Sequence, residues 1–325
     1  MVVDNIDEII KNQLDKTLKE TNLSSLGNLY RGKVRDNYIK DNVRIIIATD
    51  RLSAFDRVIT TIPFKGQMLN QVSSFWFEKT KNIVKNHIID IPDPNVAVVH
   101  QCDLIPVEMI IRAYITGTAW RNYLNNIPIS GIRLPEKLQK NQKLDDLMIT
   151  PSTKAESGHD IYLSKNEIIK RKYVEKDIYE EMENAAIKLF RFGQKYCEQN
   201  GLILVDTKYE FGLKDNELYV IDEIHTQDSS RFWILESYED HFKNGEDPEI
   251  LDKEIFRGWL METYPDIFPN ISPEQEIPPI SSDIKIELAK RYMRSYAKIT
   301  GLEFKAEVAN VEARIIKNLQ KFNYI

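Results

Sequence analysis

Residues 201–225 read GLILVDTKYEFGLKDNELYVIDEIH, and this stretch predicts a β-hairpin. Leu202–Leu213 and Glu217–Ile224 are rich in the β-branched and aromatic residues that favour strands, and Lys214–Asn216 between them is typical of a turn.

The charged residues of this hairpin suggest chemistry. Side chains alternate between the two faces of a strand, so Lys208 and Glu210 share a face. A three-residue turn sets Lys208 opposite Asp222 and Glu210 opposite Val220. Two carboxylates beside a lysine suit a nucleotide, because carboxylates hold Mg²⁺ and a lysine neutralises phosphate oxygens. Two alternatives stay open: a two-residue turn would move Asp222 to the other face, and the charges could form a solvated edge.

Outward from this hairpin, strand-rich and helix-rich stretches are partly segregated, which favours an α+β fold over a doubly wound sheet. Alternation and β-branched residues predict strands at 29–31, 34–39, 43–49, 96–100 and 107–115. Helical periodicity predicts helices at 6–18, 66–84, 119–124, 178–201, 250–262, 283–299 and 305–321. A polar loop is predicted from Asn125 to Lys165.

The composition limits the function classes. With 325 residues the chain has room for about two domains. The net charge of −6 argues against general nucleic-acid binding. Neither a secretory signal nor an apolar run of the ~20 residues that a membrane helix needs is present. The two cysteines, Cys102 and Cys197, are far apart and no Cys/His spacing suits zinc. We therefore expect a cytoplasmic globular protein in a reducing compartment.

Two further segments could bind anions. In Tyr30–Arg35, Gly32 permits close approach of a phosphate and Lys33 supplies charge, although an ordinary basic hairpin loop has the same pattern. Arg112 lies inside the apolar strand 107–115, where an unpaired charge is costly, so it should have an anionic partner. Thr116–Thr118 precede a helix whose N-terminal amides can hold an anion. A structural salt bridge and an N-cap threonine are the alternative.

Basic residues also follow the hairpin. Arg231 ends the segment Asp228–Arg231, and Lys253 and Arg257 lie four residues apart on one helix face. Such groups recognise carboxylate or phosphate, but isolated basic residues are often only solvated at the surface.

Taken together, six segments in order resemble the SAICAR synthetase (phosphoribosylaminoimidazole-succinocarboxamide synthase) family. The two specific matches are Leu204–Gly212 (LVDTKYEFG) and Pro106–Gly117 (PVEMIIRAYITG). Supporting matches are Tyr30–Asp36, Asp50–Asp56, Thr150–Glu156 and Ile221–Trp233. The matches span about residues 28–260, and the length and the Thr150–Glu156 segment resemble the longer, fungal-type branch.

The resemblance implies a fold and a reaction. The fold has a kinase-like N-terminal antiparallel β-lobe, residues 1–104, and an α+β C-terminal lobe, residues 105–325, with the nucleotide between them and a helical C-terminus. The reaction belongs to de novo purine biosynthesis and joins L-aspartate to the carboxylate of carboxyaminoimidazole ribonucleotide (CAIR), giving SAICAR, ADP and phosphate. ATP, CAIR and aspartate are then the small-molecule partners, and Mg²⁺ is the cofactor.

The resemblance also implies residue roles. The ATP phosphates are assigned to Gly32, Lys33 and Arg35, and adenine to the connection that holds Asp103 and Leu104. Lys208 is assigned to phosphate or ribose, and Glu210 and Asp222 to Mg²⁺. The catalytic candidates are therefore Lys33, Lys208, Glu210 and Asp222. The CAIR phosphate is assigned to Arg112, Thr118 and Arg231, and the imidazole carboxylate to Ser53 and Asp56. Lys253 and Arg257 are placed near the substrate anions, and Lys154 near aspartate or CAIR. Thr118 stands where we expect Ser in the family and keeps the hydroxyl donor.

Two other function classes share part of this pattern. A kinase would also combine a β-lobe, a Gly-Lys loop and paired metal carboxylates, but the chain has neither H-R-D-x-x-x-x-N nor D-F-G. A non-catalytic nucleotide-binding module is the third possibility. The sequence leaves open the oligomeric state, the order of substrate binding and the group that deprotonates the aspartate amine.

Overall fold

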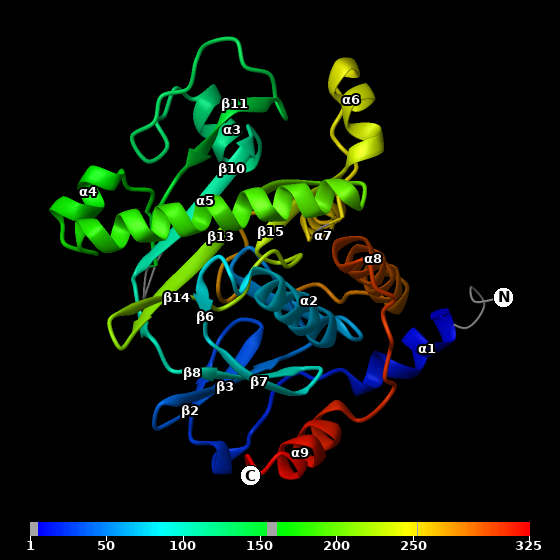
Figure 1. The fold of residues 1–325 in the computed structure, drawn as a ribbon. Helices are drawn as coiled ribbons and strands as arrows, with labels where there is room; N and C mark the ends of the chain where they lie inside the picture. The colour runs from blue at the N-terminus through cyan, green and yellow to red at the C-terminus, as the bar shows by residue number, and fades with distance from the viewer. Residues whose placement is uncertain (1–5, 155–160, 252) are drawn as a thin grey trace. The chain divides into compact units, whose positions relative to one another are not determined.

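Two larger sheets organise the chain, each in its own unit (Figure 1). The computed structural model describes residues 6–154, 161–251 and 253–325. Of these residues, those up to Phe75, those in Ile88–Gln101 and those from Leu251 onward form unit 1, and those in Trp76–His87 and Cys102–Ile250 form unit 2. Residues 251–325 thus group with unit 1, whereas the sequence-based division assigned them to the second lobe; that division stays a prediction. The mixture of antiparallel sheets and helices is the α+β fold expected.

The sheet of unit 1 has five antiparallel strands in the order β1-β2-β3-β8-β7. Their bounds are β1 (Asn28–Arg31), β2 (Arg35–Lys40), β3 (Val43–Ala48), β7 (Ile88–Asp93) and β8 (Val96–His100). The strands predicted at 29–31, 34–39 and 43–49 are confirmed as β1–β3, which follow one another in the sheet. Residues 45–48 of β3 are apolar because both faces of the strand are covered there: Ile45 and Ile47 join one cluster of buried side chains and Ile46 joins another. A separate hairpin, β4 (Arg51–Ala54) and β5 (Arg57–Thr61), belongs to the same unit.

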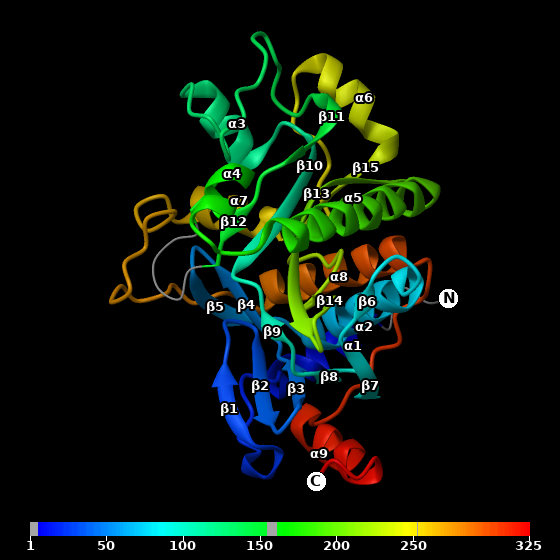
Figure 2. The same cartoon turned by 60° about the vertical axis from the view of Figure 1, so that its left-hand side comes forward.

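The helices of this part are α1 (Ile6–Gln13), α7 (Glu254–Thr263), α8 (Ser282–Thr300), α9 (Val311–Lys321) and, as far as Phe75, α2 (Lys65–Thr80). Helix α9, red in Figures 1 and 2, packs on the five-stranded sheet. Its Val311, Ile315 and Leu319 are spaced four residues apart and form one buried stripe. Arg314 fixes the helix by donating to both oxygens of the buried Asp93, at 3.1 and 3.2 Å.

The sheet of unit 2 is built around the long strand β13 (Leu202–Lys214), which pairs with β9, β10, β14 and β15. The other strands are β6 (Lys85–Asn86), β9 (Asp103–Leu104), β10 (Val107–Tyr114), β11 (Lys143–Ile149), β12 (Ser152–Thr153), β14 (Glu217–Ile221) and β15 (Ser230–Ile234). The helices are α3 (Gly117–Leu124), α4 (Lys165–Lys170), α5 (Lys176–Gln199) and α6 (Leu235–Asn244). Helix α5 lies across β13 and β10 (Figure 1).

The structure corrects several sequence predictions. The segment from 125 to 165 is not one loop, because it contains β11 and β12. Strand β11 has a polar sequence, KLDDLMI, because it is the outermost strand of its sheet and much of it is exposed to solvent. The first helix ends at Gln13 and continues as a 3₁₀ turn, and the last begins at Val311 rather than 305. No described helix is long and apolar enough to cross a membrane.

The predicted register of the β13–β14 hairpin is wrong. Glu210 pairs with Ile221, not with Val220, because the turn has two residues instead of three. Asp215 and Asn216 both adopt the left-handed backbone conformation, with φ of 53° and 62°. Asp and Asn tolerate that conformation better than most residues, and two such residues in succession close a tight hairpin.

Candidate active site

The central feature of unit 2 is a line of charged side chains on neighbouring strands, which we call the charged stripe. It comprises Glu108 and Arg112 of β10 with Asp206, Lys208 and Glu210 of β13. The strands pair so that Arg112 lies opposite Asp206 and Ile110 opposite Lys208. Glu108, Arg112, Asp206 and Glu210 are all buried. Because an unpaired buried charge is strongly unfavourable, such a stripe requires internal pairing or ligands.

Lys208 occupies the middle of the stripe between two carboxylates. Its Nζ lies 2.8 Å from Glu108 Oε1 and 3.9 Å from Glu210 Oε1. Burial lowers the pKa of Lys208, but the Glu108 and Glu210 carboxylates outweigh burial and raise it above its usual range. Lys154, which follows β12, donates to the other oxygen of Glu210. Lys208 therefore stays protonated, and both lysines place positive charge beside Glu210.

Glu210 and Asp222 repel each other. Burial first, and then the Asp222 carboxylate, raise the pKa of Glu210 to about 7, although Lys154 and Lys208 act in the opposite direction. By alternation alone, the observed register would turn Asp222 away from Glu210. Asp222 instead follows the last residue of β14 with a left-handed φ of 68°, which ends the alternation. Its charge acts on both Glu210 and Lys208, so the predicted proximity holds although the register that suggested it does not.

This carboxylate pair has the donor set for Mg²⁺. Mg²⁺ is commonly bound by one or two carboxylates, together with water and substrate phosphates, rather than by an all-protein cage. The described residues contain no group of three or more His, Cys, Asp or Glu side chains placed to hold a metal ion. The raised pKa of Glu210 also reflects negative charge that a divalent cation would neutralise.

At the other end of the stripe, two arginines share one carboxylate oxygen. Arg112 Nη1 and Arg231 Nη1 lie 2.9 and 2.5 Å from Asp206 Oδ2, and we call these three residues the arginine cluster. Arg112 also donates to Thr150 Oγ1 at 3.0 Å and to the Tyr162 hydroxyl at 3.2 Å. The anionic partner of Arg112 is Asp206, which corresponds to the structural salt bridge that the sequence analysis gave as the alternative. Two guanidinium groups on one carboxylate leave a net positive charge.

The arginine cluster lies against the start of α3. Gly117, the first residue of that helix, has a φ of 54°, and a Cβ atom there would lie 2.7 Å from Arg231 Nη2. Only glycine therefore allows the Arg231 guanidinium so close to the first turn. Thr118 is in the same turn and accepts a hydrogen bond from Arg121 at 2.8 Å. Helix N-terminal amides and a guanidinium together form a site for a phosphate-sized anion.

Unit 1 carries the predicted Gly-Lys loop. Gly32 and Lys33 connect β1 to β2 as expected, and the Gly32 amide donates to the carbonyl of Arg35 at 2.8 Å. Lys33 Nζ lies 2.5 Å from Asp56 Oδ1, and both side chains are exposed. Asp56 belongs to the turn between β4 and β5, near the partly exposed Ser53. The structure thus brings Lys33 and Asp56 together, which the sequence treated as separate candidates.

The remaining candidates occupy other positions. In unit 1, Arg257 of α7 donates to Glu254 at 2.9 Å and its guanidinium lies 4.9 Å from the centre of the Phe55 ring. Lys253 directly precedes that helix. In unit 2, Asp103 and Leu104 form the short exposed strand β9, which pairs with β13. Ala155 and Glu156 of the Thr150–Glu156 segment lie outside the described residues.

Sequence reasoning missed two members of these clusters. Glu108 and Asp206 were not assigned any role, although both lie in quoted motifs. The sequence did point to Glu108, because it lies on the same face of its strand as Arg112 and the strand is otherwise apolar. Pairing of Asp206 with two arginines could not be found in this way, because it depends on how β10, β13 and β15 are ordered in the sheet.

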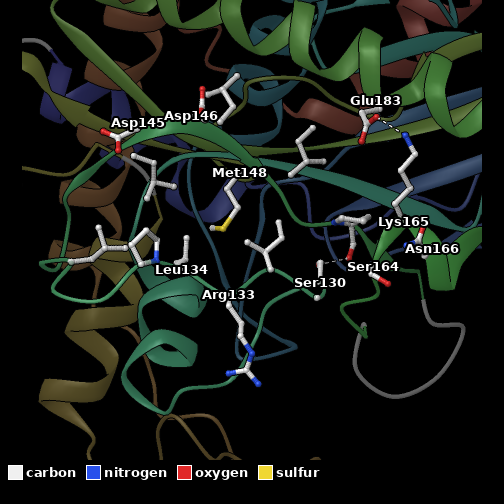
Figure 3. A pocket seen from close by; sticks show the side chains of 18 of the residues that line it. Ser130, Arg133, Leu134, Asp145, Asp146, Met148, Ser164, Lys165, Asn166 and Glu183 are labelled. Atoms are coloured by element: carbon white, nitrogen blue, oxygen red, sulfur yellow. Dashed lines mark hydrogen bonds and ion pairs between the residues drawn. The ribbon is translucent and has the colours of Figure 1, made fainter.

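A cavity of about 750 Å³ lies elsewhere in unit 2. Figure 3 shows Lys165 and Glu183, joined by an ion pair, on one side and Asp145 and Asp146 on the other, with Met148 between them and Leu134 below Asp145. None of the candidate residues named above lines this cavity. The candidate site is therefore identified by its charged side chains and not by the size of a cavity.

Comparisons with known proteins place this geometry in context. Residues 28–270 match the family described as SAICAR synthetase. The chain is 40% identical over 313 residues to a phosphoribosylaminoimidazole-succinocarboxamide synthase of Legionella pneumophila, covering 94% of this chain and 98% of that protein. It is 42% identical over 304 residues to the chloroplastic enzyme of that name from Arabidopsis thaliana, covering 90% and 72%. The fold is similar to that of the Saccharomyces cerevisiae SAICAR synthase solved with SAICAR, with a TM-score of 0.77 and 32% identity, covering 89% of this chain and all of that one.

Proposed function

The chain belongs to the SAICAR synthetase family, and we propose that the charged stripe and the arginine cluster perform separate parts of its reaction. The enzyme is a ligase of purine biosynthesis that joins L-aspartate to the carboxylate of CAIR and converts ATP to ADP and phosphate. Its substrates are small molecules. The observation that supports the division of roles is the segregation of charge along one sheet: Glu210 and Asp222 at one end, and Arg112 and Arg231 at the other.

The reaction explains why the site needs this charge. A carboxylate is a poor acyl donor, because its oxide is a poor leaving group. Transfer of the γ-phosphoryl group of ATP converts it into an acyl phosphate, which the aspartate amine then attacks. Apart from that amine, the reacting groups are anionic, so cationic side chains must bring them together and stabilise the charge that develops.

For the nucleotide, we assign the phosphates to the Gly32–Lys33 loop, with Arg35 beside it, and to Lys208. A protonated Lys208, fixed between two carboxylates, supplies a preorganised positive charge without a change of protonation state. The exposed strand that contains Asp103 and Leu104 is assigned to adenine, which backbone groups can recognise. Binding of ADP to variants of Lys33 and Lys208 tests these assignments.

For the metal, we assign Glu210 and Asp222 as the ligands. Mg²⁺, when bound there, would neutralise charge on the phosphoryl group that is transferred. Both side chains must be ionised for this role, so Glu210 has to lose its proton and its contact with Lys154 must loosen. Lys154 is then free to contact a substrate carboxylate, which is the role assigned to it.

For CAIR, we assign the phosphate to Arg231, Thr118 and the N-terminal amides of α3. Arg112 is buried and bonded to three protein groups, so in this proposal it acts mainly by orienting Asp206 and thereby Arg231. Its direct contact with the phosphate stays a prediction. The imidazole carboxylate is assigned to Ser53 and Asp56, and the remaining substrate anions to Lys253 and Arg257.

A coupled assay of ADP release tests the function as a whole. ADP should form when ATP, Mg²⁺, CAIR and aspartate are all present, and its release should stop when CAIR is omitted. ADP release that proceeds at full rate without aspartate would indicate a kinase instead. A cytoplasmic location, the fungal-type branch and the boundary at residue 104 remain parts of the proposal.

A further inference from the structure

We infer that Arg51 is a positioning residue that holds the Gly32–Lys33 loop in the conformation that receives the ATP phosphates. Arg51 begins β4 and lies outside every group assigned above. The inference rests on the phosphate-binding role proposed for the loop. It goes beyond that role by identifying what keeps an otherwise exposed loop in one conformation.

The Arg51 guanidinium is buried beneath the loop and makes four hydrogen bonds. Its Nε donates to the Lys33 carbonyl and its Nη2 to the Gly32 carbonyl, both at 2.9 Å. Nη2 also donates to Asp36 Oδ1 at 2.8 Å, and Nη1 donates to the Lys19 carbonyl at 2.5 Å. The side chain of Asp36 is fully buried, so Arg51 also neutralises a carboxylate. The planar, forked guanidinium group of Arg51 donates all of these bonds in fixed relative directions, whereas the ammonium group of a lysine cannot.

These bonds determine where the loop amides point. In a trans peptide the carbonyl and the following N–H are directed to opposite sides. The Gly32 and Lys33 carbonyls turn toward Arg51, so the amides of Lys33 and Val34 turn away from it. In the described part of the chain neither amide donates a hydrogen bond to the protein. Consecutive outward amides of this kind bind phosphate oxygens.

Thr49 extends the same support by one residue. Its Oγ1 donates to the Val34 carbonyl at 2.7 Å, and its amide donates to the same oxygen at 3.0 Å. Three successive loop carbonyls are therefore held by the segment from Thr49 to Arg51. The charge of Arg51 is balanced by Asp36, so its effect on ATP should come from the geometry of the loop and not from long-range attraction.

The test compares binding of ADP with binding of adenosine, measured by calorimetry on the purified protein. Arg51→Lys keeps a positive charge beside Asp36 but removes the fork. We expect the Kd for ADP to rise at least tenfold, while the Kd for adenosine stays within twofold. Arg44→Lys is the matched control, because Arg44 is a partly buried arginine of the same unit that donates to Gln101 at 2.9 Å and has no contact with the loop. It should leave ADP binding unchanged.

Two further variants separate the possible failures. If Arg51→Lys does not fold, Thr49→Val decides the question, because it preserves the side-chain shape and removes only the Oγ1 donor; we expect a two- to fivefold rise in the Kd for ADP. If Lys33→Ala leaves ADP binding unchanged, the proposed role of the loop is wrong. If Lys33→Ala weakens ADP binding but the Arg51 and Thr49 variants do not, or if they weaken ADP and adenosine equally, the inference about Arg51 is wrong.

Discussion

Arg231 Nη1 lies 2.5 Å from Asp206 Oδ2, across the pairing of β15 with β13. The same oxygen accepts from Arg112, so the position of Arg231 is fixed by a carboxylate that is itself anchored by a second buried arginine. Gly117 leaves the space that this arrangement requires. A positively charged guanidinium is thereby held at the N-terminus of α3 before any substrate binds, which lowers the entropic cost of capturing a phosphate.

Replacement of Arg231 should mainly weaken CAIR binding. Arg231→Ala should lose roughly 2–3 kcal/mol, the cost of leaving a charged hydrogen bond unmade, which corresponds to a rise in the KM for CAIR of about 30- to 150-fold. Arg231→Lys should also raise this KM because lysine lacks the planar fork. Since the phosphate is far from the reacting carboxylate, kcat should change much less. Steady-state kinetics check this, with the exposed Arg171→Lys as control. A change confined to the KM for ATP would move Arg231 to the nucleotide site.

Whether Arg231 needs the space left by the missing side chain of Gly117 can be tested by replacing Gly117 and, as a matched control, Gly245 with alanine. Gly117 and Gly245 have φ of 54° and 72°, but a Cβ at Gly245 would meet no atom within 4 Å. Replacing either by alanine should cost about 1 kcal/mol of stability through the left-handed backbone. Only Gly117→Ala should also displace Arg231 and raise the KM for CAIR, by about tenfold if one charged hydrogen bond is weakened. Thermal unfolding and kinetics measure both effects; equal KM values in the two variants would refute the role of Gly117.

Asp222→Asn keeps the size of the side chain and removes its charge. If Asp222 is a metal ligand, turnover should fall on the order of 10²-fold or more, as is typical when a preorganised electrostatic group is lost. Asp215→Asn, in the exposed turn of the same hairpin, is the control and should be close to wild type. Wild-type turnover of Asp222→Asn at low Mg²⁺ would exclude it as a ligand.

Metal binding should depend on pH through Glu210, whose pKa is raised to about 7. Below that pH the carboxyl is protonated and a cation must displace the proton; above it the carboxylate is already ionised. Affinity should therefore rise with pH, by up to about tenfold per unit, and level off above pH 7. Mn²⁺ binding without nucleotide, followed by water-proton relaxation, measures this. Asp222→Asn removes the repelling charge and should move the midpoint to lower pH; an unchanged midpoint would show that Asp222 does not act on Glu210.

More of the fold than of the candidate site could be predicted from the sequence. Strands β1, β2, β3, β8, β10, β13 and β14 and the long helices were identifiable, because β-branched runs such as Ile45–Ile47 and a helical stripe such as Val311–Leu319 survive in the sequence. Strands β7, β11 and β15 were not predicted, since their sequences are more polar or short. That Asp222 acts on Glu210 was anticipated, but from an incorrect register: the turn has two residues, and the Asp222 charge nevertheless raises the pKa of Glu210. The contacts of Asp206 and Arg51 could not be predicted, because each joins segments whose adjacency is set only by tertiary packing.

The most direct test of the account is mass-spectrometric analysis of the product made from CAIR, ATP and ¹⁵N-labelled aspartate. The wild-type enzyme should form a product that carries the aspartate nitrogen in a new amide, with one ADP per amide. Glu210→Gln should abolish formation of both ADP and the amide product. Arg231→Ala should still form both, provided that the CAIR concentration is high enough to offset its weaker binding. Formation of ADP with no labelled amide, or full amide formation by Glu210→Gln, would contradict the assignment of this site as the place where the ligation occurs.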